Sequence, residues 1–180
     1  VAEIAGTVTE TANAILPGLI DSDPYVAHVA MQALRRVNVW SDLPQQAAAH
    51  TDAKALAGKL ILAMTGVYDE RAIQALRNYA TESKVPELQS QAVAGLAEVD
   101  RRAAPYEKGW WGTQPARGQP VRVKNQDWSG TSTVLESLRK VMESSGSAAA
   151  KIEVAKAWRR IADPAAAPLL RKLAANSDQA

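Results

Sequence analysis

The sequence contains no cysteine, which excludes disulfides, thiolate catalysis, iron–sulfur clusters and covalently attached c-type haem within these 180 residues. It has only two histidines, His28 and His50, and the carboxylates around them show no metal-ligand spacing. Cys-x-x-Cys-His motifs, glycine-rich phosphate loops and nucleophile elbows are also absent. We therefore expect no cofactor, no bound metal and no catalytic activity in this segment.

Phenylalanine is missing too, and no apolar run approaches the ~20 residues that a membrane-spanning helix needs, so we expect no membrane span. The formal net charge is only +2, too small to indicate nucleic acid as a partner by itself. Alanine dominates an apolar content of 47%, a composition typical of packed helices. The chain starts Val1-Ala2-Glu3-Ile4, without an initiator methionine or a signal-peptide pattern, and we interpret it as a piece of a longer chain.

Apolar residues recur at helical spacing in segment after segment, and no stretch shows a convincing period of two. Start and stop signals separate these segments; for example, Asp23 can cap a helix whose first turn contains Pro24. The pattern predicts an all-α protein with a turn around Pro44. The predicted helices cover approximately residues 11–20, 24–37, 53–67, 70–82, 86–102, 132–144, 148–162 and 164–175.

Internal repetition is the most informative feature of the sequence. One apolar pattern occurs three times at intervals of 62 residues, and residues 69–83 align on 163–177. The three occurrences are Ala30-x3-Leu34-x2-Val37, Ala92-x3-Leu96-x2-Val99 and Val154-x3-Trp158-x2-Ile161. A two-helix unit of about 31 residues cannot bury its apolar faces alone, so such units stack. We predict an α-solenoid of about five HEAT-like helical hairpins; the alternative is a generic helical bundle with chance matches.

The chain is predicted to be one domain, with N-terminal repeats in 1–102, an inserted loop in 103–128 and C-terminal repeats in 129–180. The insertion is rich in glycine and proline and has no helical period, whereas its double tryptophan argues against disorder. It is either a packing plug over the repeats or a binding platform of aromatic and basic side chains. The candidate binding residues in it are Trp110, Trp111, Arg117, Arg122, Lys124 and Trp128.

Two motifs in this region resemble a known family. They are Trp110-Trp111-Gly112-Thr113-Gln114-Pro115 and Trp128-Ser129-Gly130-Thr131, the second opening a helix. They resemble the HEAT-repeat region of large multidomain bacterial proteins known as membrane-bound dehydrogenases or haem-binding proteins, over residues 21–180. In that family a sorbosone-dehydrogenase-like propeller precedes the repeats and a c-type cytochrome module follows them. Gln114 departs from the family's usual arginine.

The resemblance implies a non-catalytic spacer or docking module within a periplasmic or extracellular redox protein. Its partner would then be a protein, either a neighbouring domain of the same chain or another chain.

Two arginine pairs, Arg35-Arg36 and Arg159-Arg160, occupy equivalent positions in the repeat, and Arg101-Arg102 lies near a third helix end. One interpretation is that these cations interact with the carbonyls at helix C-termini, each worth about 0.3–1 kcal/mol. The other is a basic ridge that receives an acidic protein or a phosphate backbone. A nucleic-acid-binding repeat protein that uses this ridge and the tryptophan loop is therefore the second functional hypothesis, which the small net charge disfavours.

Overall fold

The computed structural model describes residues 2–104, 125–144 and 147–177. They form an almost entirely helical protein, which confirms the predicted all-α class. The helices are α1 (Ala2–Ile15), α2 (Pro24–Val37), α3 (Leu43–Ala48), α4 (Ala53–Met64), α5 (Glu70–Glu82), α6 (Pro86–Glu98), α7 (Thr131–Glu143), α8 (Ala148–Trp158) and α9 (Ala166–Ser177). A 3-10 helix, η1 (Leu16–Ile20), follows α1, and the short strands β1 (Arg102–Ala103) and β2 (Asn125–Gln126) lie between α6 and α7.

Aspartates begin several of these helices. Asp23 accepts a hydrogen bond of 2.8 Å from the backbone N–H of Tyr25, and Pro24 occupies the first turn of α2, as the sequence predicts. Asp69 caps α5 in the same way through the N–H of Arg71, also at 2.8 Å. Such caps satisfy backbone donors that have no partner inside the helix. They explain why the chain ends one helix and starts the next within a few residues.

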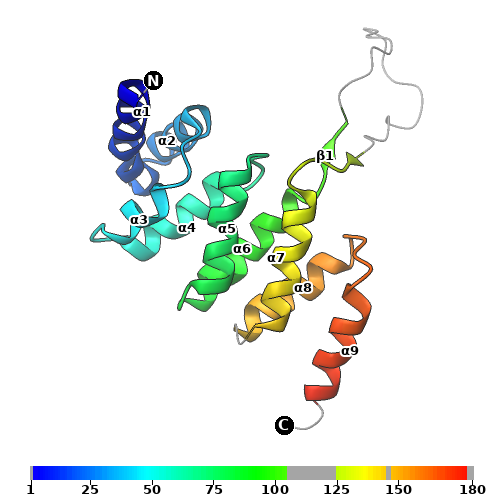
Figure 1. Cartoon of the computed structure of the whole chain (residues 1–180). Helices are drawn as coiled ribbons and strands as arrows, with labels where there is room; N and C mark the ends of the chain where they lie inside the picture. Colours follow the sequence, from blue (N-terminus) through cyan, green and yellow to red (C-terminus); the bar gives the residue numbers. More distant parts are fainter. Residues whose placement is uncertain (1, 105–124, 145–146, 178–180) are drawn as a thin grey trace, which may run out of the picture.

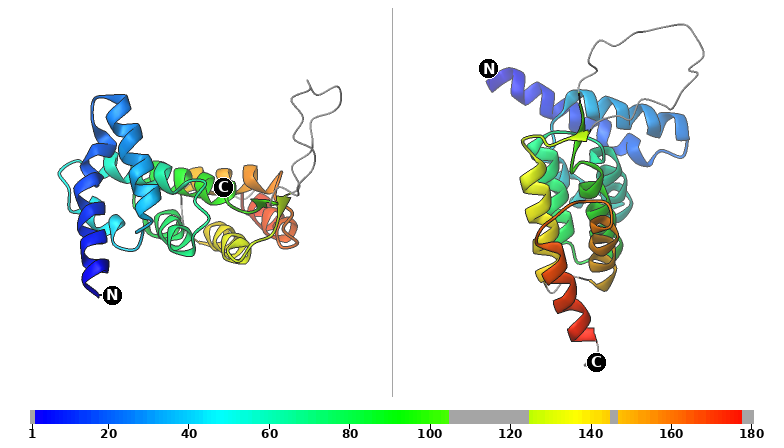
Figure 2. Two further views of the ribbon diagram at one scale, coloured as in Figure 1. Left: turned by 90° about the horizontal axis from the view of Figure 1, so that it is seen from above. Right: turned by 90° about the vertical axis from the view of Figure 1, so that its right-hand side faces the viewer.

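The helices are arranged in two layers that form an elongated stack. Helices α2, α4, α6 and α8 lie side by side in the first layer, and α5, α7 and α9 follow one another in the second (Figures 1 and 2). α6 also packs against α5, and α8 packs against α7, so the two layers share one core. α1 lies at one end of the stack and α9 at the other (Figure 1).

The buried positions of the first layer repeat along the sequence. Leu56 and Leu60 of α4 are buried, and so are Leu88 and Ala92, which follow them by 32 residues in α6. Val154 of α8 is buried at the position predicted to be equivalent to Ala92. Because neighbouring helices bury equivalent positions, the equivalent exposed positions lie along one open face of the first layer.

Direct packing between α6 and α8 shows that the second interval of 62 residues differs from the first. α3 and α4 lie between the first two occurrences of the apolar pattern, whereas only α7 and residues 99–130 separate the last two. The described residues form four successive helix pairs, α1/α2 to α7/α8, followed by α9. In these residues no helix is long and apolar enough to cross a membrane.

Candidate functional site

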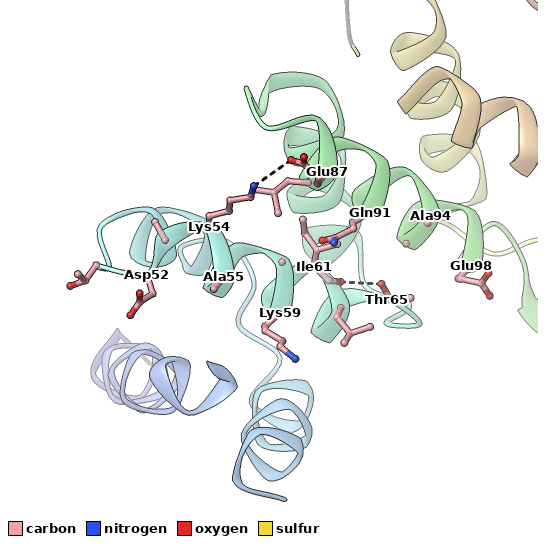
Figure 3. A pocket seen from close by; sticks show the side chains of 16 residues that line it. Asp52, Lys54, Ala55, Lys59, Ile61, Thr65, Glu87, Gln91, Ala94 and Glu98 are labelled. Atoms are coloured by element: carbon pink, nitrogen blue, oxygen red, sulfur yellow. Dashed lines mark hydrogen bonds and ion pairs between the residues drawn. The ribbon is translucent and has the colours of Figure 1, made fainter. Parts of the chain in front are cut away.

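A groove of about 1040 Å³ lies over the seam between α4 and α6 on the open face of the first layer (Figure 3). Its walls carry small or apolar side chains, of which Leu62 is the largest exposed one, with 52% of its surface accessible. The small lining residues are Ala55, Gly58, Ala94 and Gly95. Because these residues have short side chains or none, the two helices leave an apolar channel above their contact line.

The two glycines stand inside helices, where glycine costs up to about 1 kcal/mol relative to alanine. A Cβ added at Gly95 would come within 2.9 Å of the Thr65 hydroxyl, so this glycine is needed for the close approach of α4 and α6. A Cβ at Gly58 would lie 3.3 Å from the Gln91 amide oxygen, a tight contact with a flexible side chain. Gly95 therefore sets the helix separation, and Gly58 keeps the groove open.

Charged side chains surround the groove. The Lys54 ammonium lies 3.5 Å from the Glu87 carboxylate and joins α4 to α6 at one end, where Figure 3 draws it as a dashed line. At the other end of α6, Glu98 forms an ion pair of 2.7 Å with Arg160. Within the described ranges Lys59 and Asp52, both on the α4 side, have no salt-bridge partner. The α4 side of the groove therefore carries one cation and one anion that remain available.

This groove has the composition of a binding surface. All five charged residues that line it are exposed, so it holds no buried acid or base whose protonation could drive a reaction. A hydrogen bond to its own backbone N–H and the nearby Lys54 ammonium lower the pKa of Glu87, so its carboxylate is charged at neutral pH. Across the part of the chain that the structure describes, no three histidine, cysteine or acidic side chains cluster as metal ligands would.

Trp128 lies at the neck of the predicted insertion, where it has a clear packing role. Its indole N–H donates to the carbonyl oxygen of Val99 over 2.8 Å, and its half-buried ring meets that of Tyr68 edge to face at 5.3 Å. The Tyr68 hydroxyl donates to the carbonyl of Arg101. β1 and β2 pair antiparallel beside this cluster, with Arg102 opposite Gln126. The neck thus brings the two ends of the insertion together against the end of α6.

The remaining candidate residues of the insertion, Trp110, Trp111, Arg117, Arg122 and Lys124, lie outside the described residues. The choice between plug and platform therefore stays a prediction for them, whereas Trp128 is placed in the packed neck.

The four candidate arginines of the repeats are divided between two distant helices. Arg35 uses its guanidinium to donate three hydrogen bonds to carbonyls at the C-terminal end of α4, and Arg160 pairs with Glu98. Arg36 and Arg159 are exposed. Since α2 and α8 lie on opposite sides of α4 and α6, the structure does not bring the two pairs together (Figure 1).

Sequence analysis missed the α4–α6 groove. The available signal was Gly58 and Gly95 inside two strongly helical segments, because an interior glycine in a helix often marks close packing. It could not show that the two helices are adjacent, which requires the fold.

Comparisons with known proteins leave the family open: no family model, curated protein or solved structure matches this chain.

Proposed function

We propose that this chain is a non-catalytic protein-interaction module, an α-solenoid of HEAT-like hairpins whose α4–α6 groove binds a partner protein. The observation that carries the proposal is an open apolar groove with a half-exposed leucine, Leu62, between charged rims. Binding sites for protein segments have this anatomy, with an apolar centre and a polar edge. The repeated spacing of buried residues in α4 and α6 supports the solenoid.

The resemblance of the tryptophan motifs adds a setting to this proposal. In that setting the module is a spacer or docking unit of a larger extracytoplasmic redox protein, and the groove receives a neighbouring domain or another chain. The groove proposal does not depend on the setting, because it rests on residues of α4 and α6 alone.

The nucleic-acid hypothesis receives less support from the described residues. Arg36, residue 98 and Arg160 are spaced by 62 and form an equivalent set along the first layer, but residue 98 is glutamate. Glu98 pairs with Arg160 and neutralises it. The guanidinium of Arg35 is occupied by backbone carbonyls. A phosphate backbone would therefore meet an interrupted row of charges, whereas duplex binding gains from each neutralised phosphate.

The test uses peptides selected from a displayed library of random 16-residue sequences against the whole chain. Fluorescence anisotropy then compares their affinity for the wild type, Leu62→Asp and Ile152→Asp. Ile152 is a matched control, because it is an exposed aliphatic residue of the same layer, 55% accessible and outside the groove. Leu62→Asp should weaken binding at least about tenfold, since it places a charge against the apolar segment of the partner. Peptides that bind equally well to both variants would contradict the assignment of the groove.

A further inference from the structure

Resting on the proposed function, we infer that the occupant of the α4–α6 groove is an amphipathic α-helix of the partner protein that presents an acidic residue to Lys59. Three features of the groove lead to this conclusion: the hydrogen-bonding capacity of its walls, its dimensions and the charges left without a partner.

The walls of the groove cannot satisfy an extended main chain. α4 and α6 use their backbone groups for their own helical hydrogen bonds, so the groove offers no sheet edge to a strand. The Thr65 hydroxyl is engaged with the carbonyl of Ile61, and Gln91 supplies a single side-chain amide. Extended peptides would leave backbone donors and acceptors unpaired over the alanine and glycine floor, which opposes their binding. A helix satisfies its backbone internally and can present only its side chains.

The dimensions suit a helix. α4 has 12 residues and α6 has 13, so the walls are roughly 18–20 Å long at 1.5 Å per residue. A partner helix of about 12–14 residues would span them. The small residues Ala55, Gly58 and Ala94 permit close approach of its axis, since the separation of packed helices depends on the side chains at the contact.

The charges on the α4 side give the bound helix a direction. Asp52 and Lys59 lack salt-bridge partners in the described parts of the chain and lie about two helical turns apart, roughly 10 Å along the axis. Figure 3 shows Lys59 projecting from α4 on the side away from α6, whereas Lys54 extends toward Glu87. A helix with an acidic residue beside Lys59 and a basic residue beside Asp52 pairs both, and the reversed helix brings like charges together.

The experiment selects binders to the whole chain from two displayed libraries. One contains 14-residue helix-forming sequences without proline, and the other contains sequences of the same length with proline at every third position, which holds them extended. Only clones that lose affinity for Leu62→Asp are kept, because these occupy the groove. We expect them to come from the helical library and to gain helical circular dichroism on binding. A central proline in the peptide should weaken binding by about tenfold or more.

The charge is tested by reversal. Lys59→Glu should weaken the selected helices by about three- to fivefold, and replacing the matching acidic residue of the peptide by lysine should restore the affinity. Lys172→Glu, the same change on α9 and away from the groove, should leave the affinity unchanged.

Each outcome decides between the two proposals. Groove binders that come only from the proline library would overturn the helical occupant and leave the protein-interaction function standing. Helical binders that are indifferent to Lys59→Glu would overturn the assigned charge contact. If neither library yields a clone sensitive to Leu62→Asp, the proposed function fails and the inference fails with it.

Discussion

The side chain of Arg35 connects α2 to the C-terminal end of α4. Its Nε donates to the carbonyl of Ala63 over 2.8 Å, and its Nη2 donates to those of Thr65 at 2.9 Å and Leu62 at 3.2 Å. The last carbonyls of a helix have no partner within it, so this guanidinium satisfies groups that would otherwise need water. Arg35 thus caps a different helix from its own.

Replacing Arg35 by alanine should lower the free energy of unfolding by about 1.5–3 kcal/mol, because half-buried carbonyls lose a charged donor. Arg36→Ala is the control: its exposed neighbour should change stability by less than about 0.5 kcal/mol. Urea denaturation of the two variants measures both values. Equal losses would show that the contacts of Arg35 contribute little.

Asp69 gives the stability a pH dependence. Hydrogen bonds from the Arg71 side chain lower its pKa from 3.8 to about 2, against the opposing effect of burial. Because the folded-state value is the lower one, the stabilisation is fully present above the unfolded pKa near 4 and is lost as the pH falls toward 2. Wild type should therefore exceed Asp69→Asn by about 1–2 kcal/mol at pH 7 and by much less at pH 2.5. Urea titrations at several pH values check this, and a difference that stays constant with pH would contradict it.

At the scale of helices, the bounds of α2 and α5 were predicted correctly, because Asp23 and Asp69 provide strong start signals. α3 was missed: six residues around Pro44 resemble a turn, and only tertiary packing, which buries Leu43 and Ala47, makes them helical. α1 begins at Ala2, earlier than predicted, and Leu16–Ile20 is a 3-10 helix. Local patterns could not reveal these differences, because short helices gain most of their stability from packing.

The end of α6 depends on contacts that lie far away in the sequence. The prediction extended it to residue 102, but the helix ends at Glu98 and β1 starts at Arg102. The carbonyl of Val99 accepts from the Trp128 indole, and that of Asp100 accepts from the Thr131 hydroxyl at 2.6 Å. These partners lie about 30 residues further along the chain. No local signal could have predicted that they would end the helix.

The neck allows the plug and the platform to be distinguished. Replacing residues 104–124 by Asn-Gly would join the paired residues Ala103 and Asn125 through a two-residue hairpin turn. α6 packs directly on α8, and α5 on α7, so a platform loop can be removed with a change of less than about 1 kcal/mol in unfolding free energy. Loss of a tryptophan plug would cost about 3 kcal/mol or more. Chemical denaturation measures the difference, and we expect the small change that leaves the neck intact.

At the scale of the molecule, repetition explains both the fold and the candidate site. Equivalent positions of α4 and α6 bury leucine and alanine, which sets their spacing, and the exposed equivalents of both helices face the same side. The sequence predicts that repetition. The groove needed two further facts, the adjacency of α4 and α6 and the small residues at their seam, and only the first is a property of the whole stack.

The final prediction concerns nucleic acid, which the whole surface must attract if it binds. The formal net charge is +2, and Glu98 interrupts the set formed by Arg36 and Arg160. We therefore expect the chain to bind a 20-base-pair duplex at 150 mM salt non-specifically, with a dissociation constant of about 1–100 µM. Fluorescence anisotropy against two unrelated duplexes provides the measurement.

Glu98→Lys is the informative variant in that assay, because it removes the acid from the set and frees Arg160. It should raise the non-specific affinity several-fold and steepen its salt dependence, since each added cation contributes about one released counterion. Gln91→Lys, which adds a single charge one to two turns away without freeing an arginine, should have a smaller effect. Sequence-dependent binding by the wild type with a dissociation constant of roughly 10 nM would instead show that the interrupted set suffices and would favour the nucleic-acid function.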